Sequence, residues 1–328
     1  MGFIVLLGTL LLMINSVFLV NSSSSSSSGL SVNFYKRTCP NVEEKIWEVL
    51  VKKMKEHPTP NITIPGTLRL FFHDCFVEGC DGSVLITSTA ENKTERDADI
   101  NLSLAGDAFD IVVRAKKVLE ESCPGVVSCS DILAILARDV VVWVQGPYWE
   151  VEKGRRDGLI SIAENAQALM PPSDSNLTDL VRRFESQGLS TVDLITLSGA
   201  HTIGFTHCSE FALRINKSDP TLDPKLRKKV LGSCPFPKID PEVAEALDQS
   251  SPMIFDNQFF KNIRQHKVLL TSDQVLVSGD ASRRLVYRYA ENQEVFFKEF
   301  VTAMIKLGRL GVKTGNKGEI RRDCTKFN

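Results

Sequence analysis

A strongly apolar stretch of the 328-residue chain carries three polar side chains that a buried helix does not normally accept. Residues 68–83 read LRLFFHDCFVEGCDGS, and Arg69, His73 and Asp74 lie there among leucines and phenylalanines. A buried charge or polar group is costly unless it is paired, so each of these three side chains needs a partner inside the fold. The segment therefore raises the question of what these polar side chains would meet if the helix is buried.

Most of the chain has the apolar spacing of amphipathic helices. Residues 128–131 have the composition of a helix start. Strand-like alternation is sparse, and residues 145–176 and 216–256 are rich in the Pro, Asp and Asn of loops. With 43% hydrophobic residues to form a core, the sequence predicts an all-α fold. The expected helices are 41–55, 109–119, 130–144, 177–186, 191–197, 282–291 and 292–307.

The N-terminus predicts a secretory signal peptide. Residues 3–20 are apolar and long enough to span a bilayer, but no charged residue precedes Lys36. A membrane anchor, which is the alternative, usually has basic residues on its cytoplasmic flank, whereas here Asn21 and a serine run follow. We expect a signal peptide and Ser-rich cleavage region over 1–28, cleaved between about residues 20 and 30, and one domain over 29–328. The missing basic start is atypical of a signal peptide.

Secretion gives the eight cysteines a particular meaning, because an even number in an oxidising compartment indicates disulfides. Eight cysteines allow about 105 pairings, and only Cys75 and Cys80 are close enough in sequence to suggest a pair. A zinc site formed by these two with His73 and Asp74 is the alternative. The net charge of −1 argues against binding to nucleic acid or to an anionic membrane. N-x-S/T sequons occur at Asn61, Asn92, Asn101, Asn176 and Asn216.

One of the five histidines has a cationic neighbour at helical spacing. Arg69 and His73 are four residues apart, so a helix places them on one face. A nearby cation lowers the pKa of an imidazole, which leaves a neutral base beside a guanidinium that can stabilise developing negative charge. The alternative is a helix with two polar residues facing water.

A second histidine lies among small residues. His201 belongs to DLITLSGAHTIG, residues 193–204, with Gly199, Ala200 and Gly204 around it. Small neighbours let a flat, bulky group approach the backbone, and imidazole is a common ligand of haem iron. A core histidine in a tightly packed helix is the alternative. The remaining histidines are expected at the surface or in structural positions, namely His57, His207 and His266.

The loop after His73 has the oxygen-rich composition of a Ca²⁺ site. Asp74, Asp81 and Ser83 offer side-chain oxygens, nearby carbonyls can add to them, and Gly79 and Gly82 permit a sharp turn. The spacing is not that of an EF-hand, and a solvated acidic loop is the alternative.

Six segments together resemble one family, the secreted plant haem peroxidases known as class III. The resemblance extends over about residues 30–328. It implies an all-α haem peroxidase fold, stapled by disulfides, with one haem b held between a distal and a proximal helical subdomain. It also implies an enzyme that reduces hydrogen peroxide and oxidises phenolic donors by one-electron steps. The segments are RLFFHDCFVEGCDGS, VVSCSDIL, GRRDG, LSGAHTIG, IFDNQFF and TSDQVL.

The resemblance assigns roles on the distal side of the haem. His73 matches the acid/base that moves a proton between the two peroxide oxygens, and Arg69 matches the arginine that stabilises charge during O–O cleavage. Phe72 matches an aromatic wall. Asn101 matches the residue that holds the imidazole of His73 in its working tautomer, and Glu95 matches the acid that connects this network to calcium. Asn101 is also a sequon, and we predict that it carries no glycan, because a glycan would prevent that hydrogen bond.

On the proximal side, the resemblance makes His201 the iron ligand and Asp273 the carboxylate that accepts its second N–H, a partner that makes such a ligand more basic. Pro171 matches a residue at the edge where reducing substrates dock. Two Ca²⁺ ions per chain are implied. The distal ion would be bound by Asp74, Val77, Gly79, Asp81 and Ser83, and the proximal ion by Thr202, Asp248, Ser251, Ile254 and Asp256.

Four positions depart from the family pattern. Leu247 replaces a common aromatic residue beside the proximal imidazole, and Ser251 replaces a common threonine. Asp99 and Asp174 stand where relatives can have aromatic residues near the haem edge, so we expect an acidic rim that favours neutral or cationic donors. The implied disulfides are Cys39–Cys123, Cys75–Cys80, Cys129–Cys324 and Cys208–Cys234, each adding about 2–4 kcal/mol of stability.

The resemblance implies a monomer that is secreted to the cell wall, or sent to the vacuole, without membrane attachment after cleavage. Hydrogen peroxide and small phenols, such as lignin or suberin precursors, would be its partners. One alternative is a wall-binding or structural protein that keeps the fold without the chemistry, and another is a calcium-binding glycoprotein without haem. Such proteins could dispense with the chemical residues, yet all five are present: Arg69, His73, Asn101, His201 and Asp273.

Overall fold

The computed structural model describes residues 29–56, 62–216 and 219–328, and these residues are mainly helical. The expected all-α class is confirmed. The strands of the described residues form one antiparallel pair, in which Thr206 of β1 (Phe205–His207) faces Glu245 of β2 (Ala244–Ala246). The predicted signal peptide, His57 and the sequon at Asn61 lie outside the described residues.

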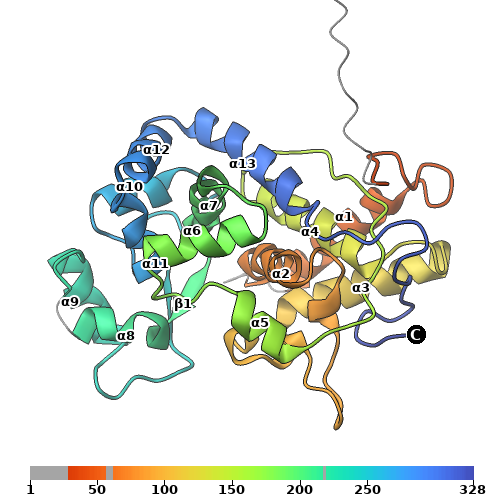
Figure 1. Ribbon diagram of the computed structural model, residues 1–328, viewed down its shortest axis with the longest axis horizontal. Helices are drawn as coiled ribbons and strands as arrows, with labels where there is room; N and C mark the ends of the chain where they lie inside the picture. Colours follow the sequence, from red (N-terminus) through yellow and green to blue (C-terminus); the bar gives the residue numbers. More distant parts are fainter. Residues whose placement is uncertain (1–28, 57–61, 217–218) are drawn as a thin grey trace, which may run out of the picture.

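The first half of the chain packs around α2, the helix formed by Thr63–Val77. This helix contacts α3, α4 and α5, while α1 packs against α3 and α4 (Figure 1). Almost every residue of α4 is buried, and its buried charged side chains, Asp131, Arg138 and Asp139, all have ion-pair partners. The other elements of this half are α1 (Val42–Glu56), η1 (Ser83–Leu85), η2 (Glu95–Asp97), η3 (Asp99–Asn101), α3 (Gly106–Ser122), α4 (Cys129–Trp143) and α5 (Ala163–Leu169).

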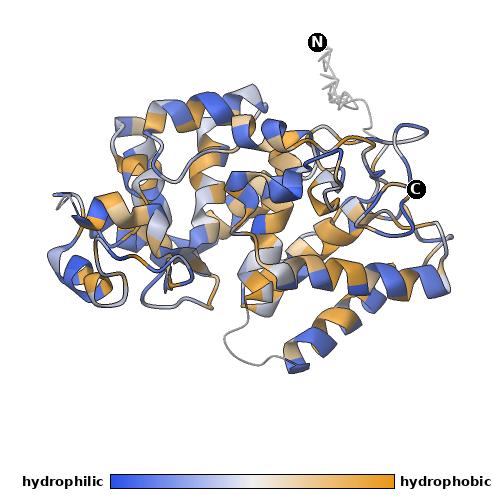
Figure 2. Cartoon of the chain, turned by 90° about the horizontal axis from the view of Figure 1, so that it is seen from below, coloured by the Kyte–Doolittle hydropathy of each residue, from blue (hydrophilic) through white to orange (hydrophobic). Residues whose placement is uncertain are grey.

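The second half forms another helical layer, joined to the first by α13 (Gln293–Leu307), which contacts both α7 and α2. Figure 2 shows that the outer helices carry both hydrophilic and hydrophobic residues, as helices with one buried face do. The remaining elements here are α6 (Leu177–Ser186), α7 (Thr191–Ser198), η4 (Gly199–Thr202), α10 (Gln258–Arg264), α11 (Thr271–Gln274), η5 (Val275–Val277) and α12 (Asp280–Glu291).

A small unit at one end of the molecule has its own core. Helices α8 (Cys208–Asn216) and α9 (Pro224–Ser233) pack there beside the two strands (Figure 1). The expectation of loops over 145–176 and 216–256 was wrong for α5, α9 and β2. Helix α9 forms because Asp223 accepts a hydrogen bond from the Leu226 amide and because Leu226 and Val230, four residues apart, are buried together.

Helix starts elsewhere follow the sequence. The Ser128 hydroxyl accepts from the Asp131 amide at 3.1 Å, which confirms the predicted start of α4. Ser190 and Asp193 form a reciprocal capping box at the start of α7, the helix that leads into His201. The orientation of the His201 segment is thus fixed by local capping at its N-terminal end.

The four disulfides implied by the resemblance are confirmed, and none of the described cysteines is free. Because Cys75 and Cys80 are bonded to each other, the zinc alternative is wrong. No helix within the described ranges is long and apolar enough to cross a membrane. The bonds are Cys39–Cys123, Cys75–Cys80, Cys129–Cys324 and Cys208–Cys234.

Candidate active site

His73 lies on the buried face of α2 and is only 5% exposed, so the alternative of a water-facing imidazole is wrong. Its Nδ1 lies 2.6 Å from Oδ1 of Asn101. The Nδ2 group of Asn101 donates to the Glu95 carbonyl at 2.7 Å, which fixes the amide orientation. Because Oδ1 can only accept, Nδ1 of His73 carries the proton and Nε2 is left as a base.

Arg69 lies one turn before His73, and its Nε donates to Nε2 of His73 at 3.2 Å. Its terminal nitrogens donate to the carbonyl and hydroxyl of Ser103 at 3.1 and 2.9 Å. The guanidinium is thus held over the basic nitrogen of the imidazole. Ser103 has no sequence signal, since its partner lies 34 residues away, and sequence reasoning missed it.

The surroundings of His73 keep it neutral. Burial, with the Arg69 cation as a second cause, lowers its pKa to about 3, against an opposing effect of the Asn101 hydrogen bond. A neutral imidazole with an unprotonated Nε2, beside a cation, can take a proton from a ligand bound nearby.

Two buried carboxylates, one in the loop after His73 and one close to it, each have one oxygen without a hydrogen-bond partner. Asp74 is fully buried and its Oδ2 accepts from the Gly82 amide, but its Oδ1 has no hydrogen-bond partner. Oε1 of buried Glu95 also has none, while Oε2 accepts from the Ser83 hydroxyl at 3.1 Å. Burial raises the pKa of Asp74 to about 8 and the pKa of Glu95 well above its usual value. Orphaned acceptors of this kind fit a bound cation.

Two further residues shape this loop. Asp81, 1% exposed, accepts from the Ser83 amide and pairs through its other oxygen with Lys313. Gly79 has a φ of 100° and touches the backbone of Gly311, where no side chain would fit. Val77 ends α2. Sequence reasoning missed Lys313 because it comes from a segment more than two hundred residues away.

His201 has a different partner. Its Nδ1 lies 2.8 Å from Oδ1 of Asp273, whose side chain is 3% exposed. The carboxylate accepts the Nδ1 proton, so Nε2 of His201 keeps its lone pair. The His201 side chain itself is 39% exposed, which disagrees with the alternative of a tightly packed core histidine.

The two histidine segments approach each other at one end. Gly204, just after His201, lies so close to Pro65 that an added Cβ would be 2.7 Å from the proline ring. Pro65 is eight residues before His73 on α2, or about 12 Å along the helix axis. Arg69 is accessible to water, yet the protein around it is dense enough to lower the pKa of its guanidinium by desolvation. Both Arg69 and the His201 side chain keep solvent-accessible surface, which fits a planar group bound beside them.

A second set of oxygen atoms lies next to His201. The Thr202 hydroxyl donates to Asp256 at 3.0 Å, and the Ser251 hydroxyl lies 3.0 Å from both Asp248 and Asp256. Ile254 follows in the same loop, 41% exposed. No three Asp, Glu, His or Cys side chains in the described ranges converge into a metal site by themselves. A cation at either set would therefore need hydroxyl and carbonyl oxygens as well.

Other predicted residues lie around this region without a shared contact. Phe72 stacks on Phe76 and Phe184 at 4.9 and 6.0 Å between ring centroids. Pro171 is partly exposed in the segment between α5 and α6, and Leu247 is buried with its amide bonded to the Gly204 carbonyl. The structure thus places Phe72 in an aromatic layer on α2, while Pro171 remains an expected docking position.

Of the two carboxylates in the predicted acidic rim, one is paired with a lysine. Asp99 is exposed and pairs with Lys93 at 3.1 Å, whereas Asp174 is simply exposed. Asn101 is 2% exposed and uses both amide atoms, in agreement with the prediction that it carries no glycan.

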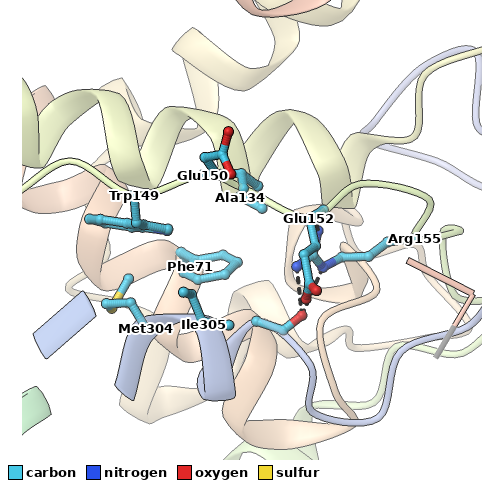
Figure 3. Close-up of a pocket in the computed structure, with 10 residues that line it drawn as sticks. Phe71, Ala134, Trp149, Glu150, Glu152, Arg155, Met304 and Ile305 are labelled. Carbon is cyan, nitrogen blue, oxygen red and sulfur yellow. Dashed lines mark hydrogen bonds between the residues drawn. The ribbon is translucent and has the colours of Figure 1, made fainter. Parts of the chain in front are cut away.

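Two other pockets lie elsewhere. A cavity of about 10 Å³ between α2, α4 and α13 is lined by Phe71, Trp149 and Met304, and Arg155 donates to the Gly308 carbonyl at its edge (Figure 3). A groove of about 570 Å³ runs along α12 and the start of α13. Neither His73 nor His201 lines these pockets.

The presence of an arginine–histidine–asparagine chain and of a histidine–aspartate pair agrees with the comparisons. A family model described as peroxidase matches residues 46–292. Peroxidase 55 of Arabidopsis thaliana is 48% identical over 318 residues, or 95% of this chain and 94% of that protein. Peroxidase 51 of the same plant is 47% identical, over 97% of this chain and 98% of its own length. The chain therefore belongs to the class III plant peroxidase family, and it is an enzyme that acts on hydrogen peroxide.

Proposed function

We propose that the site between α2 and η4 binds one haem b and uses it to reduce hydrogen peroxide. Membership of the peroxidase family implies a haem. When bound, the haem supplies the redox chemistry, and the protein supplies ligation, proton transfer and exclusion of other reactions. His201 would hold the iron through Nε2, while Asp273 accepts the Nδ1 proton and makes the ligand more basic.

On the opposite side, Nε2 of His73 would accept a proton from the nearer oxygen of hydrogen peroxide and deliver it to the farther oxygen. Arg69 would stabilise the negative charge that develops as the O–O bond breaks. Asn101 would keep the proton on Nδ1, so that Nε2 is always the nitrogen that reacts. Phe72 would form an apolar wall beside the peroxide.

The reducing substrates are proposed to be small phenols, which give up one electron at a time at an edge that includes Pro171. An acidic rim at Asp99 and Asp174 would favour neutral or cationic phenols over carboxylated ones. The partners of the enzyme are thus hydrogen peroxide and phenols, and we infer that it works as a monomer. Secretion after removal of residues 1–28 is proposed from the apolar leader and the four disulfides.

We also propose two Ca²⁺ ions. The unpartnered oxygens of Asp74 and Glu95 support a distal ion, with Asp81, Ser83 and the carbonyls of Val77 and Gly79 as further ligands. The hydroxyl–carboxylate cluster of Thr202, Asp248, Ser251 and Asp256, with Ile254, supports a proximal ion. Glu95 would couple the distal ion to the haem site, because its carbonyl holds Asn101.

The observation that carries the proposal is the contrast in partners: an amide and a guanidinium for His73, a carboxylate for His201. The test is a visible spectrum of the purified protein before and after one equivalent of hydrogen peroxide, followed by donor screening. We expect a haem band that changes on addition of peroxide and returns when a phenol is added. Absence of a haem band would overturn the proposal.

A further inference from the structure

A continuous series of aromatic rings leads away from His201 into the core of the second half. The imidazole meets the ring of Phe259 edge-on at 5.9 Å between centroids. Phe259 contacts Phe260 at 5.1 Å, and Phe260 contacts Tyr289 on α12 at 5.0 Å. The rings also press on the backbone before His201, since a Cβ on Gly199 would be 2.9 Å from Phe260. Only glycine at position 199 permits this close packing.

The last ring of this series is the one that can lose an electron together with a proton. Tyr289 is 0% exposed, and its hydroxyl donates to a carboxylate oxygen of Glu299 on α13. The Thr196 hydroxyl lies 2.7 Å from the hydroxyl oxygen of Tyr289, and since Tyr289 donates to Glu299, Thr196 donates to Tyr289. Thr196 belongs to α7, the helix that runs into the His201 segment. Tyr289 is therefore connected to His201 both through a series of edge-to-face ring contacts and through one helix.

Glu299 has the properties of an acceptor for the phenolic proton. Its side chain is 28% exposed and lies 3.5 Å from Arg288, so it touches both the buried hydroxyl and the solvent. A carboxylate within hydrogen-bond reach of an O–H is the geometry required for direct proton transfer. A proton that reaches Glu299 is not trapped in the core.

We propose that Tyr289 is a redox relay that supplies one electron to the oxidised haem when no phenolic donor is bound, an inference that rests on the proposed function. In this step the O–H bond of Tyr289 breaks, its proton goes to Glu299 and its electron goes toward His201. The products are a neutral tyrosyl radical and a protonated Glu299, and hydrogen peroxide is the oxidant. A phenol later gives one electron to the tyrosyl radical and releases its own proton to solvent, while Glu299 returns its proton to the Tyr289 oxygen, so that Tyr289 and Glu299 regain their resting forms.

The other three tyrosines provide matched comparisons. Tyr35 is buried and donates to a carboxylate, Asp131, at 2.7 Å, but it packs on Phe34 near the N-terminus. Tyr148 and Tyr287 are 61% and 38% exposed, and each has an arginine over its ring. Since the chain has four tyrosines, single Tyr→Phe variants can assign any tyrosyl radical to one residue.

The test is rapid-freeze electron paramagnetic resonance of the haem-loaded full protein, mixed with one equivalent of hydrogen peroxide without a donor. We expect a tyrosyl radical in the wild type and in Tyr35→Phe, Tyr148→Phe and Tyr287→Phe, and its loss in Tyr289→Phe. Glu299→Gln keeps a hydrogen-bond acceptor but removes the base, so the radical should form on the order of 10²-fold more slowly.

A visible spectrum of each sample shows whether haem is bound and has reacted with peroxide. A normal spectral change without a tyrosyl radical, or a radical that persists in Tyr289→Phe, would overturn the relay while leaving the proposed function intact. Absence of the haem band in the wild type would overturn the proposed function, and the relay with it. Equal radical formation in Glu299→Gln and wild type would contradict the proton transfer.

Discussion

The two histidines of the site have the same side chain but differ in burial and in hydrogen-bond partners. His73 is 5% exposed and bonded to an amide oxygen and a guanidinium, whereas the His201 side chain is 39% exposed and bonded to a buried carboxylate. An amide accepts the Nδ1 proton without adding charge, and the adjacent cation further disfavours protonation. A carboxylate adds negative charge and strengthens the opposite nitrogen as a ligand.

This difference shows that the role of the Nε2 atom of an imidazole is set by the hydrogen-bond partner of its Nδ1 atom. His73 is arranged to exchange a proton, because its free nitrogen is unprotonated and a cation lies beside it. His201 is suited to hold a metal, because its side chain is 39% exposed, its Nε2 keeps a lone pair and its Nδ1 is bonded to Asp273. If Asn101 and Asp273 exchanged places, mutation of His73 should therefore have the effect now expected for mutation of His201, and the reverse.

The largest expected effect comes from His73→Leu. This variant removes the proton acceptor, so we expect the rate constant for reaction with hydrogen peroxide to fall by on the order of 10⁴-fold. Haem content, measured from the absorption spectrum, should not change. His207→Gln is the control. A rate constant in His73→Leu within twofold of the wild-type value (about 0.4 kcal/mol) would contradict the role of His73 as the proton acceptor.

Asn101→Val should have the next largest effect. It frees the tautomer and orientation of His73, and loss of such an outer partner typically costs about 10–100-fold in rate. Asn92→Gln, at a sequon asparagine without contact to His73, is the matched control. Stopped-flow kinetics with peroxide would measure both, and an unchanged rate in Asn101→Val would show that Asn101 does not set the tautomer.

The pH dependence of the peroxide reaction also tests the environment of His73 and Arg69. Because the pKa of His73 is lowered to about 3, the peroxide reaction should stay constant from pH 7 to about pH 4 and then fall. Arg69→Leu removes a cation and should move this acid limb to higher pH. An acid limb near the ordinary histidine pKa in the wild type would contradict a buried, neutral His73.

The lowered pKa of His73 also determines the direction in which the stability of the fold changes with pH. The folded pKa of His73 lies below its unfolded value, so between about pH 3 and 6.5 the unfolded chain binds more protons. The contribution of neutral His73 to stability is fully present above about pH 6.5 and is lost as the pH falls through that window. His73→Leu should therefore flatten part of the melting temperature profile over this range.

Removal of the proposed Ca²⁺ should have a smaller effect on rate, about tenfold at most, because the distal ion would act through Glu95 and Asn101. The melting temperature should fall, since Asp74 and Glu95 would lose their counter-charge. With the pKa of Asp74 raised to about 8, calcium binding at pH 7 should release protons. Calorimetry in two buffers measures that release, and its absence, or an unchanged melting temperature after chelation, would contradict the distal site.

The smallest effect is expected for Asp99→Asn. Asp99 is exposed and already paired with Lys93, so its field at the haem edge is weak and salt-screened. The ratio of KM values for ferulate and a neutral phenol should change by less than about twofold, in favour of ferulate, at low salt. A larger change would mean that the acidic rim dominates donor choice.

Local patterns predicted the helices, because caps and spacing act within a few residues. Helix α6 begins and ends where the spacing placed it, and Ser128 caps α4. The short helices α5, α8, α9, α10 and α11 were missed, since a short segment contains few apolar repeats. The resemblance predicted the four disulfides, which periodicity and spacing could not, since eight cysteines allow many pairings.

The partners of the site were less accessible to sequence reasoning. Ser103 beneath Arg69 and Lys313 beside Asp81 come from other segments and have no local signal. The aromatic series to Tyr289 also joins η4, α10 and α12, which only the folded chain brings together. Contacts across segments have to be read from three-dimensional structure.

The most direct test of the central claim, that His201 holds the haem while His73 exchanges protons with peroxide, is imidazole rescue. His201→Gly and His73→Gly would each be purified and their spectra recorded with and without added imidazole. We predict that His201→Gly loses the wild-type haem ligation and regains it with imidazole, whereas His73→Gly keeps that ligation throughout and reacts slowly with peroxide. Wild-type ligation in His201→Gly without imidazole, or its loss in His73→Gly, would contradict the assignment.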